Sequence, residues 1–210
     1  MQLAPFPRGL YAVTPDIADT DLLREMVQGC LEGGARVVQY RNKVAPAKLR
    51  NQQAQALLPL CRAFQVPLII NDDVKLCLAL DADGVHIGKT DGDVAAIRRR
   101  IEADKILGVS CYNQFALAQH AHAAGADYVA FGACFASATK PLAVKAELNL
   151  FQQAQQHGLC AVGIGGIQLD NAAPLIAGGA HAIAVIQALF ASQQRDQIRQ
   201  QAAQFCLLFN

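Results

Sequence analysis

Short apolar runs alternate with longer amphipathic stretches along the whole chain. The apolar runs predict eight buried strands, centred near residues 10, 37, 69, 85, 107, 129, 162 and 184. They lack the clean two-residue alternation of a strand with one face in water. This pattern is typical of parallel strands that are covered by helices.

Helical periodicity fills the gaps between the strands. Capping residues and apolar spacing predict helices over 20–32 with Asp19 or Thr20 as the cap, over 46–65 starting with Pro46, over Val74–Leu80, after Asp93, after Asn113, and after Asp170 with Pro174 in the first turn. Residues 193–204 are expected to be part of a final amphipathic helix that ends in Phe205, Leu207, Leu208 and Phe209. Asp, Asn and Thr accept hydrogen bonds from the free amides of a first turn, and Pro fits there because it lacks an amide hydrogen.

A recurring phrase joins helix ends to strands. It appears as Gly33-Gly34, Asp83-Gly84, Ala124-Gly125 and Gly178-Gly179, where glycine is expected to end the helix in a left-handed conformation. Eight units of one strand and one helix in 210 residues predict a single domain over 1–210, a (β/α)8 barrel with parallel strands. A doubly wound open sheet is the alternative, but no G-x-G-x-x-G follows the first strand.

Composition narrows the functional classes. The net charge is +1, so the chain lacks the basic surface that nucleic acids attract. The seven cysteines include no C-x-x-C, which favours thiols in a reducing cytoplasm over disulfides or a zinc site. No signal peptide is evident at the N-terminus. Residues 172–191 carry no charge, yet Pro174 and Gly178-Gly179 interrupt them, so we expect a helix, a turn and a strand and no membrane span.

The most informative segment is Gln39-Tyr40-Arg41-Asn42-Lys43, which closes the second apolar run. Side chains alternate along a strand, so Gln39, Arg41 and Lys43 are expected on one side. Arginine and lysine both suit phosphate oxygens. The segment therefore predicts an anion site at the carboxyl end of this strand, where barrels place their chemistry.

Two carboxylates follow neighbouring strands. Asp72 comes after the third strand and Asp91 after the fourth. Facing each other across a barrel mouth, they would suit Mg²⁺, which takes one or two protein carboxylates alongside phosphate oxygens. The alternative is that both are helix caps, because each precedes a helical stretch.

Further polar groups follow the later strands. Gly165-Gly166 predicts an amide cradle for an anion at a following helix N-terminus, or else a plain turn. Ser137, Thr139 and Lys140 add two hydroxyls and a cation, although such a loop can also be simply solvated. His86 is expected to be a hydrogen-bonded structural residue, since Val85 and Ile87 look core-facing. Room for two anionic groups suits an enzyme that joins two phosphorylated small molecules.

In this order and spacing, six motifs resemble the thiamine phosphate synthase family from Gly9 to about Phe190. They are Gln39-Tyr40-Arg41-Asn42-Lys43, Ile69-Ile70-Asn71-Asp72, Gly84 to Asp91, Gly108-Val109-Ser110, Ser137-Ala138-Thr139-Lys140 and Gly163 to Ile167. The resemblance implies a (β/α)8 barrel that couples a hydroxymethylpyrimidine diphosphate with a (carboxy)thiazole phosphate. The products would be thiamine phosphate and pyrophosphate, with one Mg²⁺ ion per subunit and a homodimer as one option.

The resemblance also implies roles for individual residues. The pyrimidine diphosphate would be bound by Gln39, Arg41, Lys43, Asn71, Ser110 and Lys140, of which Arg41, Lys43, Ser110 and Lys140 would be catalytic. The thiazole phosphate would contact Ser137, Ala138, Thr139, Gly166, Ile186 and Gln187. Asp72 and Asp91 would carry the metal.

The chain departs from the family pattern at four places. They are Ser137 for Thr, Ala133-Cys134 for Gly-Pro, Lys89 for Gln and Gln187 for Ser. Two other functions stay open at this point. One is the related thiazole tautomerase, which need not bind a diphosphate and Mg²⁺, and the other is a phosphate-binding barrel without catalysis.

Overall fold

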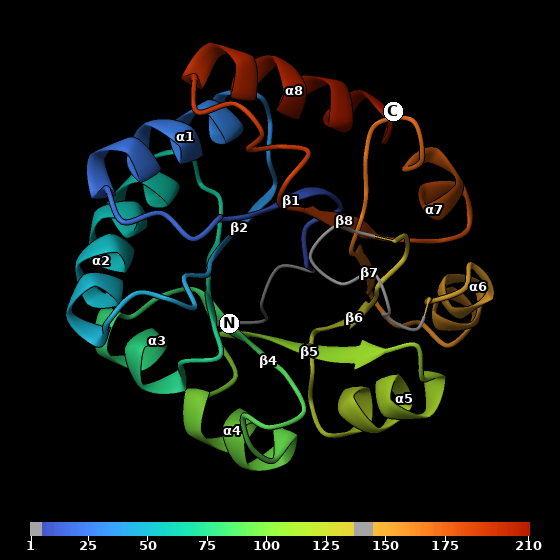
Figure 1. The fold of residues 1–210 in the computed structure, drawn as a ribbon. Helices are drawn as coiled ribbons and strands as arrows, with labels where there is room; N and C mark the ends of the chain where they lie inside the picture. Colours follow the sequence, from blue (N-terminus) through green and yellow to red (C-terminus); the bar gives the residue numbers. More distant parts are fainter. Residues whose placement is uncertain (1–5, 137–144) are drawn as a thin grey trace.

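The described part of the chain is a closed barrel of eight parallel strands inside a ring of helices (Figure 1). The computed structural model describes residues 6–136 and 145–210. Strand order around the barrel follows the chain from β1 to β8, and β8 pairs with β1 to close it. The predicted (β/α)8 barrel is confirmed, and the open doubly wound sheet is excluded because neither edge strand is left unpaired.

Strands and helices alternate strictly. The strands are β1 Gly9–Val13, β2 Val37–Tyr40, β3 Leu68–Asn71, β4 Gly84–Ile87, β5 Ile106–Tyr112, β6 Tyr128–Phe131, β7 Ala161–Ile164 and β8 Ala182–Val185. The helices are α1 Thr20–Glu32, α2 Ala47–Ala63, α3 Val74–Leu80, α4 Val94–Ile101, α5 Phe115–Ala123, α6 Asn149–Gln156, α7 Ala173–Ala177 and α8 Arg195–Leu207. All eight strand predictions are confirmed, and residues 172–191 form α7 and β8 as expected.

The pleat of the strands divides the core into two layers. Tyr11 on β1 and Tyr128 on β6 point into the barrel, where they pack in a small interior cluster. Their neighbours along the strands, such as Leu10 and Val129, point outward into the larger cluster beneath the helices. Because successive side chains on a strand alternate, the apolar strand residues are buried on one side or the other, except for Tyr112 and Ile164 at strand ends. This explains the continuous apolar runs of the sequence.

Helix caps agree with the sequence in part. Asp19 and Asp93 accept amide hydrogen bonds at the starts of α1 and α4, as predicted. The other two predicted caps are wrong. Helix α5 begins after Gln114, one residue beyond Asn113, and α7 begins after Ala172 without a side-chain cap. Pro174 lies in the first turn of α7 as expected.

Three of the four predicted glycine turns adopt the left-handed conformation, with positive φ at Gly34, Gly125 and Gly179. In the fourth turn, Asp81 instead of a glycine adopts the left-handed conformation, with φ 52°. Gly84 is needed there for a different reason. A Cβ at Gly84 would lie 2.3 Å from the Ile106 carbonyl oxygen of the neighbouring strand. Glycine is required there by the close approach of β5.

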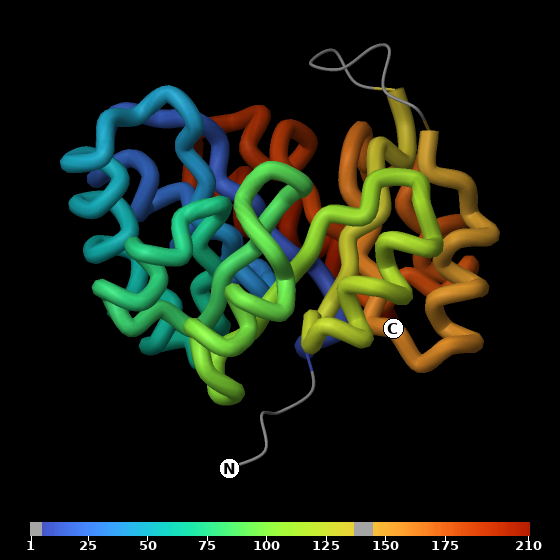
Figure 2. The backbone as a smooth tube through the Cα atoms, turned by 90° about the horizontal axis from the view of Figure 1, so that it is seen from below, coloured from blue at the N-terminus to red at the C-terminus, as the bar shows by residue number. Residues whose placement is uncertain are grey.

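The last helix completes the ring. Helix α8 packs against α1, so the two ends of the helical layer meet beside β1 (Figure 1). The side view in Figure 2 shows the tube running once around the molecule, from blue through green to red. The seven cysteines are all free thiols, five of them buried. In the two described ranges, no helix is long and apolar enough to cross a membrane.

Candidate active site

The end of β2 and the loop that follows it are anchored to α2 by side-chain hydrogen bonds. Tyr40 and Asn42 reach α2, where the Tyr40 hydroxyl donates to Gln53 Oε1 at 2.8 Å and Asn42 Nδ2 donates to the same oxygen at 3.1 Å. Asn42 Oδ1 also accepts the Ala45 amide at 3.1 Å. These bonds fix the loop that carries Arg41 and Lys43, and Lys43 lines the cavity next to it.

The loop after β1 orients both cations. Asp16 Oδ1 accepts from Arg41 Nη1 at 3.2 Å and from the Lys43 amide at 2.8 Å. Thr14 Oγ1 donates to the Arg41 carbonyl at 2.9 Å and accepts the Arg41 amide at 2.8 Å. Thr14 and Asp16 were not predicted as positioning residues. Their position directly after the first strand could have indicated this role, because polar groups also follow the remaining strands.

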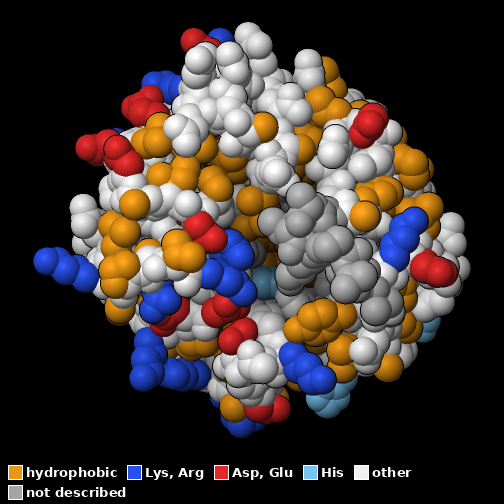
Figure 3. All heavy atoms as spheres, in the orientation of Figure 1, with side chains coloured by type: hydrophobic (Ala, Val, Ile, Leu, Met, Phe, Trp, Pro, Cys, Tyr) orange, Lys and Arg blue, Asp and Glu red, His pale blue; other side chains and the backbone are white. Residues whose placement is uncertain are grey.

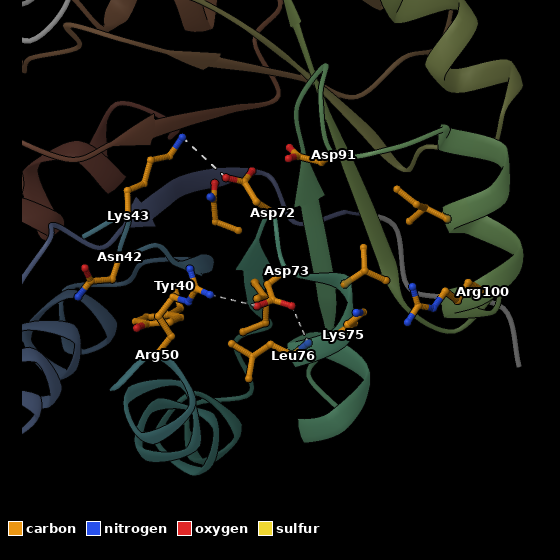
Figure 4. A pocket seen from close by; sticks show the side chains of 14 residues that line it. Tyr40, Asn42, Lys43, Arg50, Asp72, Asp73, Lys75, Leu76, Asp91 and Arg100 are labelled. Carbon is orange, nitrogen blue, oxygen red and sulfur yellow. Dashed lines mark hydrogen bonds and ion pairs between the residues drawn. The ribbon is translucent and has the colours of Figure 1, made fainter. Parts of the chain in front are cut away.

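Asp72 and Asp91 are not helix caps, so that alternative is wrong. The caps of α3 and α4 are Asp73 and Asp93, one and two residues further along. Asp72 takes a left-handed conformation with φ 61° at the end of β3, and its Oδ2 lies 3.7 Å from Lys43 Nζ. Asp91 Oδ2 accepts the Gly88 amide at 2.7 Å. Figure 4 shows Lys43, Asp72 and Asp91 on three loops, facing the same space.

The two carboxylates influence each other. Burial raises the pKa of Asp72, and the negative charge of Asp91 raises it further, while Lys43 and Asn71 oppose the shift. Like charges disfavour each other's ionised form unless a cation lies between them. The pair is therefore a place where positive charge from a ligand is favourable.

A cavity of about 530 Å³ opens beside this pair. Its lining includes four cations, Lys43, Arg50, Lys75 and Arg100, together with Asn71, Asp72, Asp73 and Asp91. Figure 3 shows lysine, arginine and acidic side chains gathered next to the hollow near the barrel axis. The buried Nε of Arg50 has no hydrogen-bond partner in the part of the chain that the structure describes. The cavity is thus suited to a highly charged ligand.

On β5 the predicted pyrimidine residue Ser110 is half-buried and bonded to His86. His86 Nε2 lies 2.8 Å from Ser110 Oγ, and His86 Nδ1 lies 2.9 Å from the hydroxyl of Tyr128. His86 is thus buried and hydrogen-bonded, as expected, but it faces the barrel interior while Val85 and Ile87 face the helices. Burial lowers the pKa of His86 to about 4, so its ring is neutral at physiological pH.

A pH-dependent stability follows from this shift. The unfolded chain gains a proton on His86 below its ordinary pKa of 6.5, whereas the folded protein gains it only near pH 4. The unfolded state therefore binds more protons in this window, and stability falls as the pH falls from about 6.5 to 4. We expect wild type to lose thermal stability more steeply across this range than His86→Gln. Parallel melting curves for the two proteins would contradict this assignment.

Gln39, predicted to bind the diphosphate, lies deeper than expected. Its side chain is buried inside the barrel, and its Nε2 donates to the hydroxyl of Tyr11 at 2.8 Å. Asn71 ends β3 beside Asp72 and lines the cavity, as a diphosphate ligand would. The roles of both residues toward a substrate stay predictions.

The predicted second anion site lies across the mouth, after β7 and β8. Gly166 has φ 64°, and a Cβ there would lie 2.7 Å from the Phe135 and Ala136 carbonyl oxygens. The helix that was expected to follow Gly166 is α7, which begins only at Ala173, after an intervening loop. Asn171 closes the intervening loop by donating to the Gly166 carbonyl at 3.1 Å. Ile186 and Gln187 follow β8 at the same rim.

Four predicted site residues, Ser137, Ala138, Thr139 and Lys140, lie outside the described residues. Their contacts to either phosphate stay predictions. The described neighbour Cys134 is buried, and its amide donates to the Ile164 carbonyl at 2.9 Å, so this departure from the family pattern is accommodated by β7.

The fold and the mouth together define a (β/α)8-barrel protein with cations and paired carboxylates at the carboxyl ends of its strands. The family model for thiamine monophosphate synthase matches residues 10–189, and the chain belongs to this family.

Individual relatives and a solved structure support this family membership. The thiamine-phosphate synthase of Methylobacillus flagellatus is 56% identical over 203 residues, which cover 97% of this chain and 96% of the relative. That of Chromobacterium violaceum is 52% identical over 188 residues, covering 90% of this chain and 91% of the relative. A solved thiamine phosphate pyrophosphorylase from Pyrococcus furiosus superposes with a TM-score of 0.82 at 29% identity, covering 96% of this chain and 95% of that one.

Proposed function

We propose that this protein joins hydroxymethylpyrimidine diphosphate to a thiazole phosphate, releasing pyrophosphate and forming thiamine phosphate. The observation that carries the proposal is the convergence of Lys43, Asp72 and Asp91 on one charged cavity, with Arg41 held on the same loop as Lys43 by Asp16. Family membership supports it independently.

The chemistry fits residues that bind charge. The bond between the pyrimidine methylene carbon and the diphosphate oxygen breaks, and its electron pair leaves with pyrophosphate. The lone pair of the thiazole nitrogen then forms the new carbon–nitrogen bond to the pyrimidine-stabilised cation. Negative charge grows on the leaving group, so Arg41 and Lys43, with Lys140, lower the barrier by electrostatic stabilisation. No activated side-chain nucleophile is needed.

Asp72 and Asp91 fit Mg²⁺ by the chemistry of their donors. Both are hard oxygen ligands on neighbouring loops, and their mutual repulsion favours a cation between them. Within the described residues no group of three or more metal-binding side chains occurs. Two carboxylates suit an ion that shares its coordination with substrate phosphates. When bound, Mg²⁺ would neutralise charge on the diphosphate.

The remaining rim would hold the second substrate. Gly166, Ile186 and Gln187 follow β7 and β8, where barrels commonly bind a phosphate, and Ser137, Ala138 and Thr139 would complete that contact. The two anions would then enter from opposite sides of the mouth. The seven free thiols support a reducing, cytoplasmic location for the enzyme.

The outcome of one incubation separates this function from its alternatives. With Mg²⁺ and both substrates, we expect pyrophosphate and thiamine phosphate to form in equal amounts. Isomerisation of the thiazole phosphate without coupling would identify a tautomerase instead. Binding of either phosphate without any reaction would identify a non-catalytic barrel.

Magnesium is expected to stabilise the protein before any substrate is added. A cation at the Asp72–Asp91 pair binds only the folded state, so it raises the midpoint of thermal unfolding, Tm. We expect MgCl₂ to raise Tm of wild type more than NaCl does at equal ionic strength. The difference should disappear in Asp72→Asn. Equal shifts by the two salts in wild type would argue against a metal at this pair.

A further inference from the structure

A continuous chain of side-chain hydrogen bonds crosses the barrel interior from β2 to β5. Gln39 Nε2 donates to Tyr11 Oη at 2.8 Å, and Tyr11 Oη lies 2.7 Å from Tyr128 Oη. Tyr128 Oη lies 2.9 Å from His86 Nδ1, and His86 Nε2 lies 2.8 Å from Ser110 Oγ. We call these five residues the interior chain. It begins at Gln39 and ends at Ser110, two residues that are predicted to bind the pyrimidine diphosphate.

The first donor determines the direction of every bond that follows. The amide nitrogen of Gln39 can only donate, so the Tyr11 oxygen accepts and its proton is available for Tyr128. The Tyr128 hydroxyl in turn donates to His86 Nδ1, which must carry a lone pair. A protonated Nδ1 would leave one buried hydroxyl proton without an acceptor, which is costly. The ring proton of His86 therefore sits on Nε2 and is donated to Ser110 Oγ.

The surrounding packing holds Tyr128 in its place. The Phe6 ring stacks on the Tyr128 ring with centroids 4.2 Å apart. On the other strand, Gly108 leaves the space that the Tyr128 ring fills, because a Cβ there would lie 2.0 Å from Tyr128 Cζ. Gly108 and Ser110 lie on the same side of β5, since they are two residues apart. The Gly108-Val109-Ser110 motif thus leaves space for the Tyr128 ring at Gly108 and supplies the hydrogen-bond partner of His86 at Ser110.

We propose that His86 is a positioning residue that makes Ser110 a hydrogen-bond donor toward the pyrimidine. With His86 Nε2–H bonded to its oxygen, Ser110 keeps its own proton for a ligand in the half-buried mouth. The matching group on the ligand is an unprotonated ring nitrogen, the acceptor that a pyrimidine carries and a benzene ring lacks. The inference rests on the proposed function for the identity of that ring, and the protonation pattern of the chain stands apart from it.

The protonation pattern can be measured without substrate. In wild type labelled with ¹⁵N-histidine, we expect the His86 Nδ1 resonance in the range of an unprotonated ring nitrogen and Nε2 in the range of a protonated one. In Tyr128→Phe, protonated Nδ1 should appear, because nothing donates to it. Tyr40→Phe is the matched control, since it removes a buried hydroxyl bond outside the barrel and should leave the His86 resonances unchanged. Protonated Nδ1 in wild type would overturn the proposal.

Ligand affinity tests the consequence for Ser110. By calorimetry, Tyr128→Phe is expected to bind the pyrimidine diphosphate about tenfold more weakly, the loss of roughly one hydrogen bond. An analogue with a benzene ring should bind wild type and Tyr128→Phe equally, because it offers Ser110 no acceptor. Equal weakening for both ligands would mean that the variant only disturbs packing, and would reject the role of His86. If Tyr128→Phe does not fold, the wild-type spectrum still decides which ring nitrogen of His86 is protonated. The affinities of wild type for the pyrimidine diphosphate and for its benzene analogue then test Ser110, and equal affinities would reject its role as a donor. Failure to release pyrophosphate would reject the proposed function and leave the protonation result standing.

Discussion

Replacing Asp72 by Asn is expected to abolish turnover while Tm stays equal or rises. Turnover should fall by at least about a hundredfold, the usual scale for losing one group that stabilises a developing charge. Stability should not fall, because the raised pKa of Asp72 shows that its ionised form is unfavourable beside Asp91. Asparagine also tolerates the left-handed backbone at this position, φ 61°. The measurements are steady-state pyrophosphate release and thermal melting without added metal.

Asp93→Ala is the matched control, since it removes a nearby carboxylate with the opposite role. The Asp93 side chain accepts the Ala96 amide at 2.8 Å and caps α4. Its loss should lower the free energy of unfolding by about 1 kcal/mol and leave turnover unchanged. If Asp72→Asn instead melted early and kept its activity, Asp72 would be a structural residue and the metal site would lie elsewhere.

The contrast between these neighbours shows what the sequence could predict. Alternation of apolar runs and helices predicted the barrel because each strand is buried on both sides, a property of local composition. The sequence also placed Asp72 and Asp91 after β3 and β4. The sequence offered Asp93 as a cap, yet it could not exclude that Asp72 and Asp91 also cap helices, because a cap depends on where the backbone turns. Before α3, that turn is set by the left-handed conformation of Asp72. The spacing of apolar residues in the sequence does not reveal such a conformation.

The interior of the barrel was the least predictable part. Tyr11, Tyr128 and His86 each sit in an apolar run, and nothing local indicates that their polar ends meet. The contact requires β1, β4 and β6 to converge on the barrel axis. Tyr128 and His86 are 42 residues apart in the sequence. Asp16 was missed for a related reason. Its partners Arg41 and Lys43 are supplied by the next strand of the closed barrel.

Arg41→Met should give the second large loss of activity. The guanidinium of Arg41 presents a planar fork of donors, held at 3.2 Å by Asp16, and it carries the charge needed as the diphosphate leaves. We expect kcat/KM for the pyrimidine diphosphate to fall by about a hundred- to a thousandfold. Arg41→Lys keeps the charge and loses the fork, so it should recover only part of this loss. The dissociation constant of the thiazole phosphate should change little, because its predicted contacts lie after β7 and β8.

Arg62→Met provides the comparison that separates a local role from a change in net charge. Arg62 lies at the far end of α2, where it bonds the Asp81 carbonyl at 2.9 Å on an exposed surface. Its loss should leave kcat/KM unchanged and alter stability by no more than about 1 kcal/mol. Since both variants remove one positive charge, equal losses of activity would mean that long-range attraction of the substrate dominates. A loss confined to Arg41→Met, with Arg41→Lys in between, would assign the effect to directed hydrogen bonds on the leaving diphosphate.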